Sequence, residues 1–251
     1  MTDDLRLPHP EVALVTGASS GIGRATAVRL ASLGSKVVVG YNSRREAAEA
    51  VVAELEGEGH AAMRISLEDE TSIAAAVAAV EARFGRLDAL VNNGGSTTPV
   101  PLNDLDGLTD DIFDRTVRLN LRGPFSMVRA FRPLLEKGSN AAIVNVSSLA
   151  AQKGAGSSLA YCAAKGGLDT LTIGLARVLA PKVRVFSVSP AGVDSEFVPG
   201  RTRDQLEAMA DKMPLRKITS ADDVARAIVA AITHLTSSTG IIITVDEGRH
   251  L

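Results

Sequence analysis

Apolar positions follow two alternating patterns along the chain. Short runs rich in Val, Ile and Ala, several of them continuously apolar, are separated by longer Ala-rich stretches with helical spacing. Continuous apolar runs are typical of strands covered on both faces, and their alternation with helices is typical of a parallel sheet. The runs predicted as strands are Val12–Thr16, Lys36–Gly40, Ala61–Ile65, Ala89–Asn92, Ala141–Val146, Val183–Ser189 and Gly240–Val245.

These seven runs predict an α/β fold, with one seven-stranded parallel sheet and helices on both faces. No Pro- or Ser-rich linker and no internal repeat divides the sequence, so we predict a single doubly wound Rossmann-type domain over residues 1–251. Ser20, Ser43 and Thr71 are the predicted helix starts. Residues 190–214, rich in Pro, Gly and charge, form a long connection of the kind that often covers a substrate.

Composition limits the possible partners. With 45% apolar residues, 22% charged residues and a net charge of −2, the chain has the composition of a soluble globular protein. It has no basic cluster and few aromatic residues, so we expect no nucleic-acid partner. No apolar run is long enough to span a membrane, and the acidic start at Met1–Leu5 is unlike a signal peptide, so we expect no membrane association and a cytoplasmic location. Cys162 is the single cysteine and the four histidines are scattered, which predicts no metal site.

A glycine-rich turn directly follows the first predicted strand. Residues 16–23 read Thr-Gly-Ala-Ser-Ser-Gly-Ile-Gly and lead into a helical run. Gly17 permits a tight turn, Gly21 lets backbone approach a diphosphate, and Gly23 lets the helix pack close to the sheet. The helix N-terminus adds unpaired N–H donors and positive potential. The turn could serve structure alone, but its place in the first strand-to-helix crossover favours a nucleotide-binding site.

Tyr161 and Lys165 are separated by one helical turn in an Ala- and Leu-rich segment, so they project from the same helix face. A neighbouring ammonium favours the phenolate and lowers the pKa of a tyrosine towards neutrality, which makes Tyr161 a usable acid or base. The alternative is a surface tyrosine with a chance lysine. Ser148 follows a predicted strand, at the sheet edge where α/β folds bind ligands, so its hydroxyl could hold the substrate oxygen. Ser147 is the alternative residue for this contact.

These motifs, in this order, resemble those of the short-chain dehydrogenase/reductase family, which shares TGxxxGxG, NNAG and Tyr-x-x-x-Lys. Here Asn92–Gly95 reads NNGG, and the resemblance extends to Val245–Gly248. The segment from Leu215 to Asp246 resembles the reductases of 3-oxoacyl thioesters on acyl-carrier protein. The resemblance implies an NAD(P)-dependent oxidoreductase that transfers hydride between nicotinamide and a ketone or secondary alcohol.

The resemblance also implies residue roles. Tyr161 is the expected proton donor, Ser148 the substrate positioner, and Lys165 the group that lowers the tyrosine pKa and binds the ribose. Asn120 is expected to hold a water that links Lys165 to solvent.

The end of the second predicted strand bears on the choice of nicotinamide. No acid that could accept a ribose 2′-hydroxyl occurs before Glu46, whereas Ser43 and Arg44 could bind a 2′-phosphate, so we expect NADP(H) rather than NAD(H). The alternative is that Arg44 and Arg45 form a solvated helix start. The expected cofactor-binding residues are Gly17, Ser19, Ser20, Gly21, Ile22, Gly23, Asn42, Ser43, Arg44, Asn93, Gly94, Tyr161, Lys165, Pro190, Val193 and Ser195.

Besides Gly94 in NNGG and Ser195 in place of a threonine, three positions depart from the family pattern: Ser66 replaces an aspartate expected beside the adenine, Ala191 replaces a glycine, and Glu247 stands where glycine is common. None of these changes alters the catalytic set, so we expect an active enzyme on a small-molecule substrate. A 3-oxoacyl thioester reductase is the leading hypothesis, with a dehydrogenase of a small sugar, polyol or cyclic alcohol as the alternative. A non-catalytic nucleotide sensor is the alternative of another class. The resemblance further implies a homotetramer.

Overall fold

The computed structural model describes residues 9–194, 197–200 and 202–251, and it confirms the predicted parallel sheet. Within these residues seven strands pair in the order β3-β2-β1-β4-β5-β6-β7, and each neighbouring pair is parallel. Each predicted strand end lies within about one residue of the observed end. The strands are β1 (Val12–Val15), β2 (Lys36–Tyr41), β3 (Ala61–Arg64), β4 (Ala89–Asn92), β5 (Ala141–Val146), β6 (Val183–Pro190) and β7 (Ile241–Val245).

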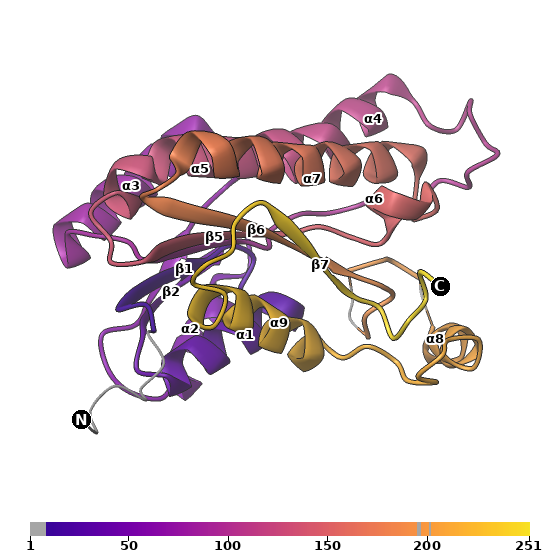
Figure 1. Cartoon of the computed structure of the whole chain (residues 1–251). Coiled ribbons are helices and arrows are strands. Elements are labelled where there is room, and N and C mark those ends of the chain that lie inside the picture. The colour runs from indigo at the N-terminus through magenta and orange to yellow at the C-terminus, as the bar shows by residue number, and fades with distance from the viewer. Residues whose placement is uncertain (1–8, 195–196, 201) are drawn as a thin grey trace.

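Helices cover both faces of the sheet, as Figure 1 shows. One face is covered by α1 (Gly21–Ser32), α2 (Arg45–Glu54) and α9 (Ala221–Thr233). The other is covered by α3 (Glu70–Phe84), α5 (Gly123–Leu135) and α7 (Leu159–Leu179), and α4 (Asp110–Val117) packs against α7. A π-helical turn (Arg118–Arg122) joins α4 to α5, while α6 (Ala150–Lys153) and α8 (Arg203–Ala210) lie beyond the carboxyl ends of the strands. None of the helices described is both long and apolar enough to cross a membrane.

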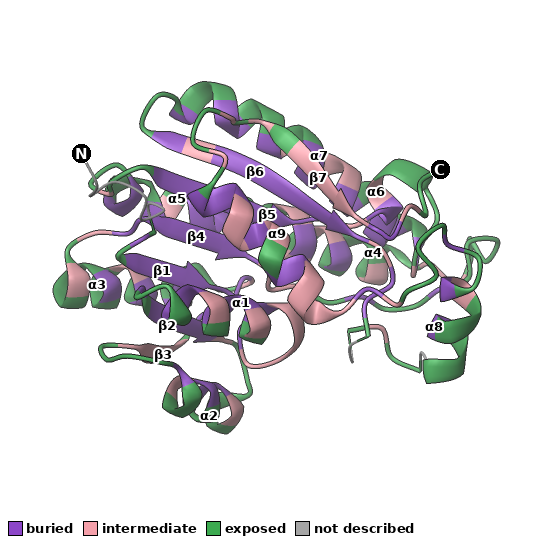
Figure 2. Ribbon diagram, turned by 60° about the horizontal axis from the view of Figure 1, so that its bottom comes forward, coloured by how far each residue is buried: buried purple, intermediate pink, exposed green. Residues whose placement is uncertain are grey.

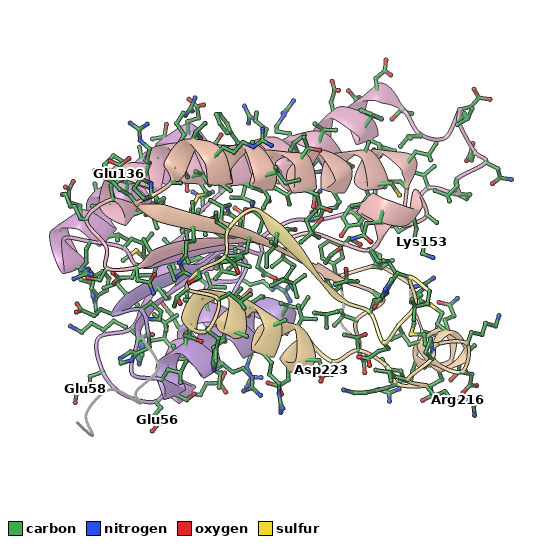
Figure 3. The ribbon with its side chains drawn as sticks, in the orientation of Figure 1. Glu56, Glu58, Glu136, Lys153, Arg216 and Asp223 are labelled. Carbon is green, nitrogen blue, oxygen red and sulfur yellow. The ribbon has the colours of Figure 1, made fainter. Side chains whose placement is uncertain are left out.

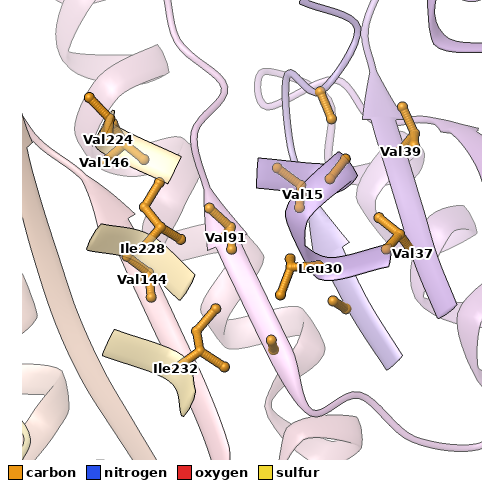
Figure 4. Close-up of a cluster of buried hydrophobic side chains, with 14 of the residues drawn as sticks. Val15, Leu30, Val37, Val39, Val91, Val144, Val146, Val224, Ile228 and Ile232 are labelled. Atoms are coloured by element: carbon orange, nitrogen blue, oxygen red, sulfur yellow. The ribbon is translucent and has the colours of Figure 1, made fainter. Parts of the chain in front are cut away.

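Two hydrophobic cores, one on each face, hold these layers together. Along β1, Val15 packs with Leu30 of α1 and Ile228 of α9, whereas Leu14 packs on the opposite face with Phe131 of α5. This alternation follows the period of two in a strand, so an all-apolar run supplies both cores at once. Figure 4 shows the first core between α1, α9 and the sheet, and Figure 2 shows the central strands buried throughout.

The topology creates a crevice at the carboxyl ends of the strands. The chain builds β1, β2 and β3 outward to one edge and then returns to place β4 on the other side of β1. The connections after β1 and β4 therefore diverge, which leaves a crevice where ligands of such sheets bind.

Some details of the connecting segments differ from the predictions. The N-caps of α2 and α3 are Arg44 and Asp69, not Ser43 and Thr71, because the Asp69 carboxylate accepts a hydrogen bond from the backbone N–H of Thr71 and so begins the helix earlier. The segment 190–214 contains α8, whose start is fixed by a capping box between Thr202 and Gln205. Part of this connection is therefore regular structure.

Candidate active site

The predicted glycine turn lies between β1 and α1 and forms one wall of a cavity of about 1340 Å³. Gly17 and Gly21 both have positive φ angles, +63° and +55°, a conformation that glycine adopts without a steric penalty. Gly23 does not border the cavity. A Cβ on Gly23 would lie 2.5 Å from the Gly17 carbonyl oxygen and 2.6 Å from Asn93 Nδ2, so this glycine permits close packing behind the turn.

Asn93 and Thr16 tie the turn to the segment after β4. Asn93 Nδ2 donates hydrogen bonds to the carbonyl oxygens of Thr16 at 2.9 Å and Gly17 at 3.1 Å. Thr16 Oγ1 in turn accepts from the backbone N–H groups of Asn93 at 3.0 Å and Gly94 at 2.8 Å. The two segments that flank the crevice are thus held at a fixed separation.

Most of the predicted cofactor residues border this cavity. Besides Gly23, which lies behind the turn, the exception is Ser195, which lies outside the described residues. Those that border it are Gly17, Ser19, Ser20, Gly21, Ile22, Asn42, Ser43, Arg44, Asn93, Gly94, Tyr161, Lys165, Pro190 and Val193.

Tyr161 and Lys165 lie on the first turns of α7 and face the same cavity. Ser158 begins the helix by accepting a hydrogen bond from the Tyr161 backbone N–H. Lys165 Nζ lies 5.6 Å from the centre of the Tyr161 ring and donates a hydrogen bond of 2.7 Å to the carbonyl oxygen of Val146. The ammonium is therefore fixed between the end of β5 and the tyrosine ring.

Burial lowers the pKa of the Lys165 ammonium from 10.5 to about 8. The Asp169 carboxylate, one turn further along α7, acts in the opposite direction and raises the lysine pKa. Asp169 is itself buried, which raises its own pKa, while a 2.7 Å hydrogen bond from Ser187 Oγ lowers it. A buried carboxylate behind the lysine is thus part of the site's electrostatics, and the sequence motifs did not reveal it.

The two candidate serines after β5 have different surroundings. Ser147 is buried, and its Oγ donates to the Lys165 carbonyl oxygen at 3.4 Å. Ser148 is partly exposed to the cavity, and its Oγ accepts from the Ala150 backbone N–H at 3.2 Å. Within the described part of the chain the Ser148 hydroxyl donates to no acceptor, so its proton remains available to a ligand.

Asn120 lies in the π-helical turn between α4 and α5 and is fully buried behind the cavity. Its Nδ2 donates to the carbonyl oxygens of Ser96 at 2.8 Å and Thr116 at 2.9 Å. Its Oδ1 has no hydrogen-bond partner among the described residues. A buried carbonyl oxygen without a partner is rare and is commonly satisfied by an ordered water.

The site's donors fit a dinucleotide. The N-cap of α1, Ser20, makes no side-chain cap hydrogen bond, and the helix N-terminus borders the cavity, so its first N–H groups can bind a diphosphate. The Ser20 hydroxyl instead accepts a 3.0 Å hydrogen bond from Arg44 Nη2. This contact places the guanidinium beside the glycine turn.

Several cavity residues lay outside the predicted cofactor and catalytic sets. Leu102, Phe197 and Met209 add apolar surface, and the Phe197 ring lies 5.9 Å from that of Tyr161. Lys153 and Arg249 add positive charge. No sequence signal marks Arg249, because it reaches the cavity only when the segment after β7 folds back beside α6.

Comparison with known proteins agrees with this geometry. The family model described as short chain dehydrogenase matches residues 11–206. A ketoacyl reductase of the granaticin polyketide synthase from Streptomyces violaceoruber is 35% identical over 97% of this chain and 98% of its own. The cis-4-hydroxycyclohexanecarboxylate dehydrogenase of Sinomonas cyclohexanicum is 38% identical over 94% of this chain and 95% of its own. The crystal structure of a short-chain dehydrogenase/reductase from Burkholderia xenovorans, 36% identical, superposes with a TM-score of 0.89 and covers 94% of this chain and 96% of that one.

The chain belongs to the short-chain dehydrogenase family. It is an oxidoreductase that acts on CH–OH or C=O groups with a nicotinamide cofactor, and the non-catalytic alternative is not favoured.

Proposed function

We propose that this enzyme is an NADPH-dependent ketoreductase that converts a ketone into a secondary alcohol. The proposal rests on one observation: the predicted catalytic residues and the predicted cofactor-binding residues border one cavity. Ser148, Tyr161 and Lys165 border the same space as the glycine turn, although they lie more than a hundred residues away in the chain. The resemblance of the segment after Leu215 and the similarity to a ketoacyl reductase support 3-oxoacyl thioesters as the leading substrates.

Residues on both sides of the crevice would hold the cofactor. The N-terminus of α1 and the glycine turn bind the diphosphate, and Lys165 binds the nicotinamide ribose. By the family resemblance, the Val193 backbone and Ser195 would bind the nicotinamide amide. Ser43 and Arg44 would bind the 2′-phosphate, which supports NADPH over NADH because, among the described residues, no acid borders the cavity at the end of β2.

When bound, the nicotinamide supplies the hydride that the carbonyl carbon receives. Ser148 donates a hydrogen bond to the substrate carbonyl and fixes its orientation. Tyr161 transfers its phenolic proton to the carbonyl oxygen, so the carbon gains the hydride and the oxygen gains the proton. The Lys165 ammonium stabilises the phenolate left behind.

A water held by Asn120 would help to return a proton to Tyr161. The unpartnered buried Oδ1 of Asn120 would accept a hydrogen bond from a water, and such a water would connect the Lys165 ammonium to solvent. The phenolate then regains its proton from the lysine side. This role predicts that Asn120 acts without touching the substrate.

A second substrate class is supported by one relative. The similarity to an enzyme named for cis-4-hydroxycyclohexanecarboxylate favours a cyclic alcohol or its ketone as the alternative. We further infer one domain over the whole chain, in which residues 190–214 select the substrate, and a cytoplasmic homotetramer.

A panel of carbonyl compounds tests the proposal. The purified enzyme is given NADPH with 3-oxobutyryl thioesters, cyclohexanones or sugars, and the loss of NADPH absorbance is followed. We expect steady turnover, fastest with the 3-oxoacyl thioesters, and faster with NADPH than with NADH. Absence of turnover with every ketone and every corresponding alcohol would refute the assignment, and equal use of NADH would refute the cofactor preference.

A further inference from the structure

Two cationic side chains border the cavity near the proposed catalytic serine. Lys153 is the last residue of α6 and lies five residues after Ser148. Arg249 lies in the segment that follows β7. Both are exposed, and Figure 3 shows Lys153 on the side of the molecule where Figure 1 marks the C-terminus. Neither residue belongs to the glycine turn or to the Tyr161–Lys165 pair.

The backbone around Arg249 is fixed by a buried carboxylate. Asp246 Oδ1 accepts from the Gly248 N–H at 3.1 Å, and its Oδ2 accepts from the His250 N–H at 2.7 Å. The Arg249 N–H donates to the Asp246 carbonyl oxygen at 2.9 Å. These bonds hold the chain on both sides of Arg249, which reduces the entropy lost when its guanidinium binds a ligand.

Lys153 is brought to the same place by a separate contact. Its Nζ donates a 3.2 Å hydrogen bond to the carbonyl oxygen of His250, the residue next to Arg249. An ammonium has three N–H donors, so this contact uses only one of them. Lys153 is therefore held beside the segment that carries Arg249, and both side chains border the cavity, although nearly a hundred residues separate them in the chain.

Asp246 and Glu247 lie close to Arg249 in the chain, but no described carboxylate forms an ion pair with either cation. Asp194 borders the same cavity, but it is paired with Arg203 at 2.5 Å. Two neighbouring positive charges at a cavity edge favour an anionic ligand.

We propose that Lys153 and Arg249 bind an anionic oxygen group, a carboxylate or a phosphate, at the end of the substrate remote from its carbonyl. This rests on the proposed function, which places that carbonyl at Ser148 and Tyr161. The exposed apolar side chains of Leu102 and Phe197 also border the cavity and suit an apolar body between the two ends. The substrate class is an oxo compound that carries negative charge.

Matched pairs of probes test this assignment and separate its two sources of charge. The carboxylate arm compares 5-oxohexanoate and 4-oxocyclohexanecarboxylate with their ethyl esters. The phosphate arm compares 3-oxobutyryl-coenzyme A with the uncharged N-acetylcysteamine thioester of the same acyl group. In at least one arm we expect kcat/KM to be about fivefold or more higher for the charged member, and added salt should reduce this difference.

Variants then assign the effect to the two residues. Lys153→Gln and Arg249→Gln should each raise KM for the preferred charged probe by about two- to fivefold and leave the uncharged probe unchanged. Lys182→Gln is the matched control, because Lys182 is an exposed lysine just before β6, at the opposite end of that strand from the cavity. Equal kinetics for charged and uncharged probes, with no effect of either variant, would overturn the proposal and leave the ketoreductase assignment intact.

A binding measurement keeps the two proposals distinguishable if no probe is turned over. The fluorescence of NADPH bound to the enzyme is followed while 5-oxohexanoate or 3-oxobutyryl-coenzyme A is added. Binding that is weakened in Arg249→Gln but not in Lys182→Gln would support the anion site even where the proposed reaction fails. Binding that is identical in the three proteins would overturn it.

Discussion

At the scale of single residues, the site depends on charged groups held at low exposure. Lys165 is 5% exposed, and its ammonium is bonded to the Val146 carbonyl and lies close to the Tyr161 ring. Burial alone would favour the neutral amine, but a buried carboxylate at Asp169 counteracts this effect. The motif of tyrosine and lysine could be recognised from spacing. The supporting carboxylate could not, because only the fold shows that Asp169 is buried and bonded to Ser187 of β6.

The pH dependence of reduction should therefore follow Lys165. The lysine carries its proton below a pKa of about 8 and loses it as the pH rises, so reduction should slow above that pH. Asp169→Asn removes the negative charge that raises this pKa, so the alkaline decline of kcat should move to lower pH. Profiles of kcat against pH for both proteins check this. Glu81→Gln, at an exposed ion pair, is the control, and an unmoved profile in Asp169→Asn would contradict the role given to the carboxylate.

Arg44 provides the test of cofactor preference. Arg44→Gln removes the proposed partner of the 2′-phosphate, and a charge-assisted hydrogen bond of this kind is worth about tenfold in affinity. KM for NADPH should rise by about that factor, while KM for NADH stays unchanged. Arg45→Gln is the control, because Arg45 is paired with Glu49 and does not border the cavity. An equal rise in KM for both cofactors would show that Arg44 supports the glycine turn and does not bind the 2′-phosphate.

At the scale of elements, the sequence predicts well those helices and strands whose position depends on a local pattern of residues. The strands are continuous apolar runs, and each was predicted to within about one residue of its observed ends. The predicted helix starts were less accurate than the predicted strand ends, because neighbouring side chains compete to cap the same N–H groups. Asp69 rather than Thr71 caps α3 for this reason. The π-helical turn that holds Asn120 has no local signal, since it depends on how α4 and α5 pack.

The packing of the glycine turn gives a direct prediction. A methyl group at Gly23 would collide with the Gly17 carbonyl oxygen and with Asn93, so Gly23→Ala should displace the turn. Affinity for NADPH, measured by fluorescence titration, should fall by about tenfold or more. Gly174→Ala is the control, because this glycine of α7 has open space where a Cβ would lie. Unchanged affinity in Gly23→Ala would contradict the account of the turn.

At the scale of the whole molecule, the cavity joins distant parts of the chain. The turn after β1, the segment after β4, α7 and the segment after β7 all border it. Predicted residues from α7 and from the ends of β1, β2, β4, β5 and β6 meet there, because parallel strands place their carboxyl ends at one edge. Arg115 and Arg249 also border the cavity but lie outside every motif, so no sequence pattern could have assigned them.

Exposed apolar residues on the outer faces of α5 and α7 bear on the proposed homotetramer. Phe125 is 40% exposed, and Ile173 and Val178 on α7 are 40% and 73% exposed. If these faces pair between subunits, Val178→Glu should reduce the mass measured by light scattering, whereas Val28→Glu on α1 should leave it unchanged. A wild-type protein with the mass of one chain would contradict the tetramer.

The proposed reaction requires Tyr161 as its proton donor, and Tyr161→Phe removes that donor. The substitution removes one hydroxyl from a buried ring, so affinity for NADPH, followed by the fluorescence of the bound cofactor, should be unchanged. Reduction of the best ketone should fall by about a hundredfold or more. Tyr41→Phe, at the only other tyrosine of the chain, should keep full activity. Turnover near the wild-type rate in Tyr161→Phe would exclude Tyr161 as the proton donor.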